Sequence, residues 1–427
     1  MRICVFEDSR VSNLYPLTLT RAAFDLHCGA ASLLERQERG LRSRAYAVLV
    51  RSEMAELCRL THPRLQVNDA AWIEDAEARE MVVLINARWL APSERIALPD
   101  ASAVGLVGEE VAYVVVPAAE ARGLSPSNLS WRLAEWRQRL LPRAAGGRMI
   151  AYPWDLVEHN GAALEDDYRH WQKAGVPVAR GVSLSGPPER CLIAETAEIE
   201  PMVHIDTTNG PVLIDSKAVV HAFSRLEGPC YIGAETRVQS ARIHGGSIGP
   251  RCRIGGEIEA SIVHGHSNKA HDGFLGHSYV GEWVNLGAGT HTSDLRTDYG
   301  PVRMVHNGQS IDTGLLKIGS YLGDHTKTSL NTLFNTGTVV GVFAQLLTFG
   351  ELLPRDVPSF CRYGRGQLHE RSGMREMFAT AAAVMARRQR EWTEVHAELF
   401  FTLFEQTAAQ RRQAVRDSEQ RRLRRVV

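Results

Sequence analysis

An aliphatic residue recurs at intervals of six in the middle of this chain, and a small or acidic residue follows it. Side chains at this interval can stack on their counterparts in the next coil of a parallel β-helix, and several coils are needed to bury such a face. The alternative is an ordinary antiparallel β domain with fortuitous Ile-Gly pairs. The repeat therefore predicts a β-helix over residues 190–362. It is carried by Ile193, Ile199, Ile232, Ile248, Ile254, Val280, Leu286 and Ile318.

The repeat has two interruptions and a clear end. Its phase breaks near residues 206–230 and 292–317, which predicts longer loops that leave the coils. Over residues 367–427, apolar residues return at intervals of three and four, which predicts a helical tail. The basic end, Arg421–Arg425, is interpreted as a solvated helix end, with binding of nucleic acid as the alternative.

Residues 1–185 have a different pattern, in which short apolar runs alternate with helical segments. Strands are expected at Ile3–Phe6, Ala45–Arg51, Met81–Asn86 and Val111–Val116. Helices are expected at Ala30–Gly40 and Ser127–Leu141. Buried strands that alternate with helices predict a doubly wound α/β domain. The Gly-, Ser- and Pro-rich segment 181–188 is the expected linker.

Charge and cysteine usage restrict the possible partners and compartments. The chain has 49 basic and 49 acidic residues, which disfavours a nucleic-acid or membrane-surface partner. The apolar runs are too short to span a bilayer. The seven cysteines are dispersed, which is typical of reduced thiols and a cytoplasmic protein.

One stretch in the repeat carries a more specific motif. Lys269-Ala-His271-Asp-Gly-Phe274-Leu-Gly-His277 is followed by Val280-Gly and then by Asn285-Leu-Gly-Ala-Gly-Thr290. This stretch resembles the bifunctional N-acetylglucosamine-1-phosphate uridyltransferase/glucosamine-1-phosphate acetyltransferase family. The resemblance implies a left-handed β-helix that assembles as a homotrimer with active sites between subunits. It also implies acetyl-CoA as the co-substrate and a sugar phosphate or nucleotide sugar as the acceptor.

The resemblance also implies roles for individual residues. The catalytic base of the family falls on His271, and a neutral imidazole is suited to take a proton near pH 7. The sugar-contacting tyrosine of the family falls on Phe274, which lacks the hydroxyl. Asn285 matches an asparagine near the substrate, and Lys269 and Arg253 are the remaining candidates for acceptor binding.

The N-terminal part resembles a divergent branch of the sugar nucleotidyltransferases over Leu14–Arg21. From this similarity, Arg10, Thr18, Thr20 and Arg21 are candidates for nucleotide binding, and Mg²⁺ is expected if the domain is active. Ordinary members need a glycine-rich loop and a lysine for the phosphates. Here no glycine follows the first strand and no lysine precedes Lys173. No carboxylate stands in residues 84–88, where the family's magnesium ligand is expected.

We therefore expect a cytoplasmic, trimeric transferase whose leading activity is acetyl-CoA-dependent N-acetylation of an amino-sugar phosphate or nucleotide sugar. Three alternatives remain open. The first is nucleotidyl transfer to a sugar-1-phosphate by the N-terminal domain. The second is a catalytically degenerate scaffold or ligand sensor. The third is a zinc-dependent hydratase like the gamma-class carbonic anhydrases, suggested by the histidines His264, His266, His271 and His277.

Overall fold

The computed structural model describes residues 2–171, 177–306 and 308–426, with side chains described as far as Arg421. The chain forms two compact units. The first contains the residues up to Leu14, Thr20–Leu26 and Ala31–Tyr152. The second contains Tyr15–Leu19, His27–Ala30 and the chain from Pro153 onward.

The first unit contains a twisted sheet with the strand order β10-β8-β9-β6-β1-β4-β5. Strands β4, β1 and β6 are parallel, and β9 runs antiparallel to both β6 and β8. All the strands and both helices predicted for this part are present in similar positions, so the α/β prediction is confirmed. The strand bounds are β1 (Arg2–Phe6), β4 (Ala47–Leu49), β5 (Gln66–Val67), β6 (Met81–Asn86), β8 (Ala103–Val107), β9 (Glu110–Pro117) and β10 (Leu141–Ala144).

The helices of this unit begin where the sequence provides suitable caps. Helix α1 (Leu33–Leu41) begins after Ser32, whose side chain accepts a hydrogen bond from the Glu35 amide while the Glu35 carboxylate accepts one from the Ser32 amide. This reciprocal pair satisfies two amides that the first turn of a helix leaves unpaired. The other main helices are α2 (Ala55–Thr61) and α5 (Leu129–Arg139).

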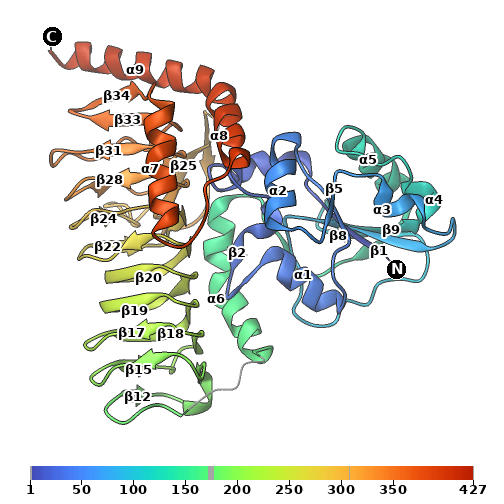
Figure 1. Cartoon of the computed structure of the whole chain (residues 1–427), viewed down its shortest axis with the longest axis horizontal. Coiled ribbons are helices and arrows are strands. Elements are labelled where there is room, and N and C mark those ends of the chain that lie inside the picture. Colours follow the sequence, from blue (N-terminus) through green and yellow to red (C-terminus); the bar gives the residue numbers. More distant parts are fainter. Residues whose placement is uncertain (1, 172–176, 307, 427) are drawn as a thin grey trace. The chain divides into compact units, whose positions relative to one another are not determined.

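The second unit is the parallel β-helix that the hexads predict, and Figure 1 shows its coils stacked in order from β12 to β34. Three ladders of parallel strands form three faces. Face A contains β12 (Ser183–Ser185), β15 (His204–Asp206), parts of β18 (Arg225–Ile232), β19 (Arg237–Ile248) and β20 (Arg253–Gly265), and β22 (Phe274–Gly276).

Face B follows face A along each coil. It contains β13 (Cys191–Ile193), β16 (Val212–Ile214), later parts of β18, β19 and β20, then β23 (Tyr279–Glu282), β27 (Ser320–Leu322), β30 (Thr338–Val340) and β32 (Asp356–Val357). Face C contains β14 (Glu198–Ile199), β17 (Val219–Val220), the first parts of β19 and β20, then β21 (Asn268–Lys269), β28 (Lys327–Thr328), β31 (Gln345–Leu347) and β33 (Cys361–Gly364).

The aliphatic residues of the repeat form the interior of these coils. On each face, the side chains that point into the β-helix stack from coil to coil, and we call such a stack the inward column. On face A this column is fully buried, because each member lies on the equivalent residue of the next coil. The column consists of Ile205, Leu226, Ile243, Ile258 and Leu275. Successive members are 15 to 21 residues apart, which is about three hexads per coil.

The structure corrects one of the two predicted interruptions. Residues 206–230 stay within the coils, since β15, β16, β17 and β18 all pair in register. The extra residues only lengthen the loops between strands. The second interruption does leave the repeat. It contains the antiparallel hairpin β25 (Arg303–His306) and β26 (Gln309–Asp312), and the coils resume with β27.

Two predicted domain boundaries also differ from the structure. The first unit ends at Tyr152 rather than near residue 185, because helix α6 (Pro153–Arg169) packs on β18, β19 and β20. The side-chain oxygen of Asn160 on α6 accepts hydrogen bonds from the Gly29 amide at 2.7 Å and the Ser247 hydroxyl at 2.9 Å. These contacts group α6 with the β-helix.

The predicted helical tail begins later than residue 367. Residues Gln367–Glu370 form strand β34, which pairs antiparallel with β33 through a turn at Arg365 and Gly366, both with positive φ. Three helices follow: α7 (Met374–Ala386), α8 (Glu394–Gln406) and α9 (Ala408–Val426). The Phe400 ring of α8 packs 4.7 Å from the Phe343 ring at a coil corner. Aromatic contacts of this kind anchor the tail to the β-helix.

The end of the tail is only partly described. Arg421 is exposed, as a solvated helix end requires, and the side chains of residues 422–425 lie outside the described residues. Within the part of the chain that is described, no helix combines the length and the apolar composition needed to cross a membrane.

Candidate functional sites

His271 lies at the corner between faces C and A, and its side chain is exposed. The corner is held from inside the coil. Lys269 occupies the inward column of face C, next to Ile254, and is only 4% exposed. Its Nζ donates hydrogen bonds to the carbonyl oxygens of Gly255 at 2.8 Å and His271 at 2.9 Å. Burial lowers the pKa of Lys269 to about 8. Lys269 therefore supports the coil from within, and its ammonium does not point to the outer surface where substrate binding was predicted.

The other motif residues lie on two different faces. Asn285 is on face C, bridged to Asn268 and Lys327, and its side-chain oxygen accepts a 2.7 Å hydrogen bond from Asn268 Nδ2. Arg253 is on the same face, where burial and the charges of Arg388 and Arg237 lower its pKa. Phe274 is on face A. A single chain thus presents these residues on both sides of the His271 corner instead of gathering them in one pocket.

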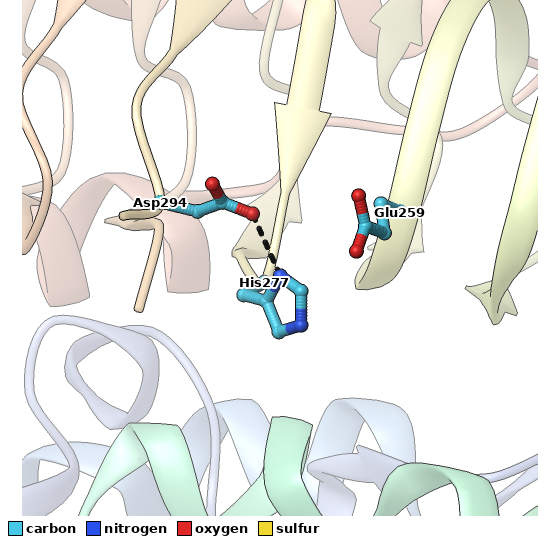
Figure 2. A group of neighbouring side chains, drawn as sticks. All are labelled: Glu259, His277 and Asp294. Carbon is cyan, nitrogen blue, oxygen red and sulfur yellow. Dashed lines mark hydrogen bonds and ion pairs between the residues drawn. The ribbon is translucent and has the colours of Figure 1, made fainter. Parts of the chain in front are cut away.

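The opposite end of β22 carries a second group of polar side chains, shown in Figure 2. Glu259, His277 and Asp294 each offer a ligand atom, and these atoms lie within 4.8 Å of one another. We call these three residues the corner cluster. The Nδ1 atom of His277 is 2.8 Å from Asp294 Oδ2. Lys317, just after the inserted hairpin, donates a 2.6 Å hydrogen bond to Glu259.

The corner cluster arises from the coil geometry. Its members are about one coil apart in sequence: Glu259 ends the face-A part of β20, His277 follows β22, and Asp294 follows β24 (His291–Thr292). Sequence reasoning noted His277 among other histidines but missed Asp294 and Lys317. The signal that could have found the cluster is the coil-length spacing of Glu259, His277 and Asp294.

The histidines considered for a three-histidine zinc site do not converge. His264 Nδ1 lies 2.9 Å from the Tyr279 hydroxyl, and His266 Nδ1 lies 2.9 Å from Glu282. Within the described residues, the corner cluster is the group whose potential metal-ligand atoms lie close to one another, and it contains a single histidine. The ligand set of a gamma-class carbonic anhydrase is therefore not assembled within this chain.

The first unit has a cavity of about 200 Å³ near the carboxyl ends of β1 and β6. In open α/β sheets, ligands bind at such strand ends. Arg88 is fully buried beside it. Its Nε and Nη2 donate to Asp8 at 2.8 and 2.7 Å, and Nη2 also donates to Glu110 at 2.5 Å. The cavity is lined by Asp8, Ser9, Arg10, Asn86, Glu109, Glu110, Val111, Leu133, Ala134 and Arg137.

This arrangement does not suit Mg²⁺. Burial would raise the pKa of Asp8, but hydrogen bonds and charge from Arg88 lower it overall. Burial would lower the pKa of Arg88, but Asp8 and Glu110 raise it overall. Both carboxylates therefore already have a fixed cation, whereas Mg²⁺ needs free oxygen ligands in octahedral geometry. Asn86 takes the position expected for the magnesium ligand and donates a 2.8 Å hydrogen bond to Asp8.

The predicted nucleotide-binding residues are dispersed. Arg10 lines the cavity, with its Nη1 3.1 Å from Glu110 Oε1. Thr20 and Arg21 are buried in the first unit and are not among the lining residues. Thr18 is buried and belongs to the second unit. Arg10 is therefore the member of this set that the structure places beside the cavity.

Comparison with known proteins finds partial similarities to sugar nucleotidyltransferases and to bifunctional nucleotidyltransferase/acetyltransferases. Residues 3–174 match the sequence model of the sugar nucleotidyl transferase family. The bifunctional sugar-1-phosphate nucleotidylyltransferase/acetyltransferase of Sulfurisphaera tokodaii is 30% identical over 209 residues, which cover 49% of this chain and 46% of that protein. The chain is thus similar to part of this bifunctional enzyme.

The other similarities are also partial. The bifunctional protein GlmU of Gloeothece citriformis is 26% identical over 237 residues, covering 49% of this chain and 45% of that protein. The chain thus spans about half the length of these curated relatives. Among solved structures, the N-acyltransferase AntD of Bacillus cereus, in complex with dTDP and 3-hydroxybutyryl-CoA, is 11% identical and covers 51% of this chain and all of that chain, with a TM-score of 0.20.

Proposed function

We propose that this protein is an acyltransferase that uses acetyl-CoA to N-acetylate an amino-sugar phosphate or a nucleotide sugar, and that its β-helix is the catalytic unit. The observation that carries the proposal is the His271 corner. Its imidazole is exposed, and its backbone carbonyl is fixed by Lys269 from inside the coil. A rigid wall that presents an imidazole to solvent is suited to general-base catalysis.

The chemistry requires one proton acceptor. The acceptor amine attacks the thioester carbonyl carbon, a C–N bond forms, the C–S bond breaks, and the thiolate leaves. His271 takes the proton from the amine nitrogen and can return it to the departing sulfur. The neutral imidazole is the form that accepts this proton near pH 7.

The location of the other motif residues supports a trimer in this proposal. Asn285 and Arg253 lie on face C and Phe274 on face A, on either side of His271. The β-helix of a neighbouring subunit, packed along this corner, would form a crevice between the two subunits. Residues of both subunits could then contact one acceptor. In this proposal the sugar-nucleotidyltransferase domain contributes ligand binding rather than nucleotidyl transfer, because Arg88 neutralises Asp8 and Glu110.

The direct experiment is thiol release from acetyl-CoA in the presence of a panel of hexosamine phosphates and UDP- or dTDP-linked amino sugars. An acetylated product, identified by mass spectrometry and dependent on the acceptor, is expected for at least one member. A parallel thermal-shift panel tests binding, since a ligand specific for the native state raises apparent stability. The absence of both product and stabilisation by acetyl-CoA would overturn the proposal.

A further inference from the structure

The corner cluster combines one imidazole and two carboxylates on adjacent coils, away from His271. We propose that Glu259, His277 and Asp294 bind a divalent transition-metal ion such as Zn²⁺ on the surface of the β-helix. This inference does not depend on acyl transfer, since it concerns a separate group of residues at the other end of β22.

The donor set suits such an ion. Imidazole nitrogen and carboxylate oxygen bind Zn²⁺ at about 2.0–2.2 Å. Figure 2 shows both carboxylates beside the imidazole, with Asp294 already joined to it. The three ligand atoms lie within 4.8 Å of one another, so a small rotation of the partly exposed Glu259 side chain brings them into coordination range. The remaining positions would be open to water or to a ligand.

The charge of the cluster also favours a cation. The Asp294 side chain is 12% exposed, and among the described residues its ion-pairing partner is His277. Glu259 pairs with the ammonium of Lys317. The formal charges of two carboxylates and one ammonium leave one negative charge that a bound cation can balance. Burying such a charge is costly unless a cation neutralises it.

Other carboxylates on face A differ in this respect, because arginines pair with them. Arg225 pairs with Asp206 at 3.1 Å, and Arg242 pairs with Glu257 at 2.6 Å. Near these pairs, His244 Nδ1 lies 2.8 Å from Glu227, which resembles the His277–Asp294 contact. Because Arg225 also pairs with Glu227, that histidine provides a matched control with the same contact but compensated charge.

Gly276 creates the space that the cluster needs. A Cβ atom at this position would lie 2.4 Å from Asp294 Oδ2 and 2.5 Å from the Phe274 ring. Any side chain would push the Asp294 carboxylate away from His277. Glycine here therefore permits the approach of the two ligands from successive coils.

The experiment is isothermal titration of untagged, metal-stripped protein with Zn²⁺, together with Co²⁺ absorption as a spectroscopic probe of the ligands. One equivalent should bind to the wild type. His277→Ala and Asp294→Asn should each weaken binding about 10-fold or more, whereas His244→Ala should bind like the wild type. Lys317→Met should bind more tightly, because the competing ammonium is removed.

Thermal melting without metal tests whether each variant is folded. If a variant does not fold, Glu259→Gln replaces it, and it should also weaken Zn²⁺ binding. The proposal is overturned if the wild type binds no stoichiometric Zn²⁺, or if His277→Ala and Asp294→Asn bind like His244→Ala. Thiol release is not used as a readout, so failure of the acyl-transfer proposal would leave this result unaffected.

Discussion

The Lys269 ammonium donates a hydrogen bond to the backbone carbonyl of His271, 2.9 Å away, from the inside of the same coil. A lysine thus replaces an aliphatic residue in the inward column, and its hydrogen bond fixes the backbone of the corner at which the His271 side chain is exposed. The arrangement makes the stability of the β-helix depend on pH, and it separates the supporting lysine from the exposed imidazole.

Lys269 and Lys327 should each contribute a rise in the free energy of unfolding between about pH 8 and pH 10.5. Burial lowers the pKa of Lys269 and of Lys327 to about 8 in the folded state, below the ordinary value of 10.5. In this window these two lysines are more protonated in the unfolded chain than in the folded chain, so their contribution to stability increases with pH. Each group can contribute a slope of up to about 1.4 kcal/mol per pH unit.

Urea unfolding at pH 8, 9 and 10 measures this slope, and Lys269→Met should reduce it. The buried cysteines contribute a slope of the opposite sign, because burial raises their pKa values, to about 11 for Cys191, and the unfolded thiols ionise first. The test is therefore the difference in slope between the variant and the wild type. An equal slope in the variant and the wild type would contradict the assignment of a depressed pKa to Lys269.

His271→Ala should reduce thiol release by about 10²–10⁴-fold, the usual cost of losing a general base. It should leave the melting temperature nearly unchanged, because the exposed imidazole contributes little to the core. The measurement is the acceptor-dependent rate at neutral pH, once an acceptor for the wild type is found. A variant that keeps the full rate shows that another group takes the proton.

Asn285→Ala should affect a different kinetic parameter. An amide can orient an acceptor but cannot accept its proton at neutral pH, so the variant should mainly raise KM. Because Asn285 also accepts a hydrogen bond from Asn268, melting curves are needed to separate weakened binding from local instability. A large fall in kcat with unchanged KM would argue against a binding role.

Arg88→Met should destabilise the first unit by about 3–5 kcal/mol, because it leaves the Asp8 and Glu110 carboxylates without their cation. Arg137→Met is the matched control. Arg137 pairs with the exposed Glu109, so its loss should cost less than about 1 kcal/mol. Urea denaturation followed by tryptophan fluorescence compares the two. Similar destabilisation by both changes would show that the buried ion pairs have no special role.

Release of pyrophosphate from UTP and N-acetylglucosamine-1-phosphate should be slow or absent, with or without Mg²⁺. The domain has no lysine before Lys173, and Arg88 occupies the carboxylates that would otherwise hold a metal. A coupled pyrophosphate assay tests this, with a GlmU enzyme as the positive control. Robust release would show that Arg10 or another arginine performs the role of the phosphate-binding lysine of ordinary sugar nucleotidyltransferases.

Light scattering of dilute protein should give three times the chain mass of 47.3 kDa. The basis is the distribution of motif residues on faces A and C around His271, which a neighbouring subunit would complete. A monomer at micromolar concentration would exclude an intersubunit active site, and the acyl-transfer mechanism proposed above would fail with it.

The sequence alone determined the architecture of both units. The repeat of Ile248, Ile254 and their counterparts specifies stacked coils, because a side chain that returns every six residues faces the same interior. The strands predicted at Ile3–Phe6 and Met81–Asn86 appear as β1 and β6, since short apolar runs are buried in the sheet. These are local periodic signals, and they can be recognised without knowing any distant contact.

Only the tertiary structure decided which side chains meet. Asp294 reaches His277 because their coils stack and Gly276 leaves room between them. Lys317 joins Glu259 because the inserted hairpin returns to the same edge. Arg88 binds Asp8 across two neighbouring strands. Lys269 resembles a ligand residue in the motif, yet its register places it inside the coil. Such contacts depend on coil length and register, which vary from turn to turn and are fixed only when the whole chain packs.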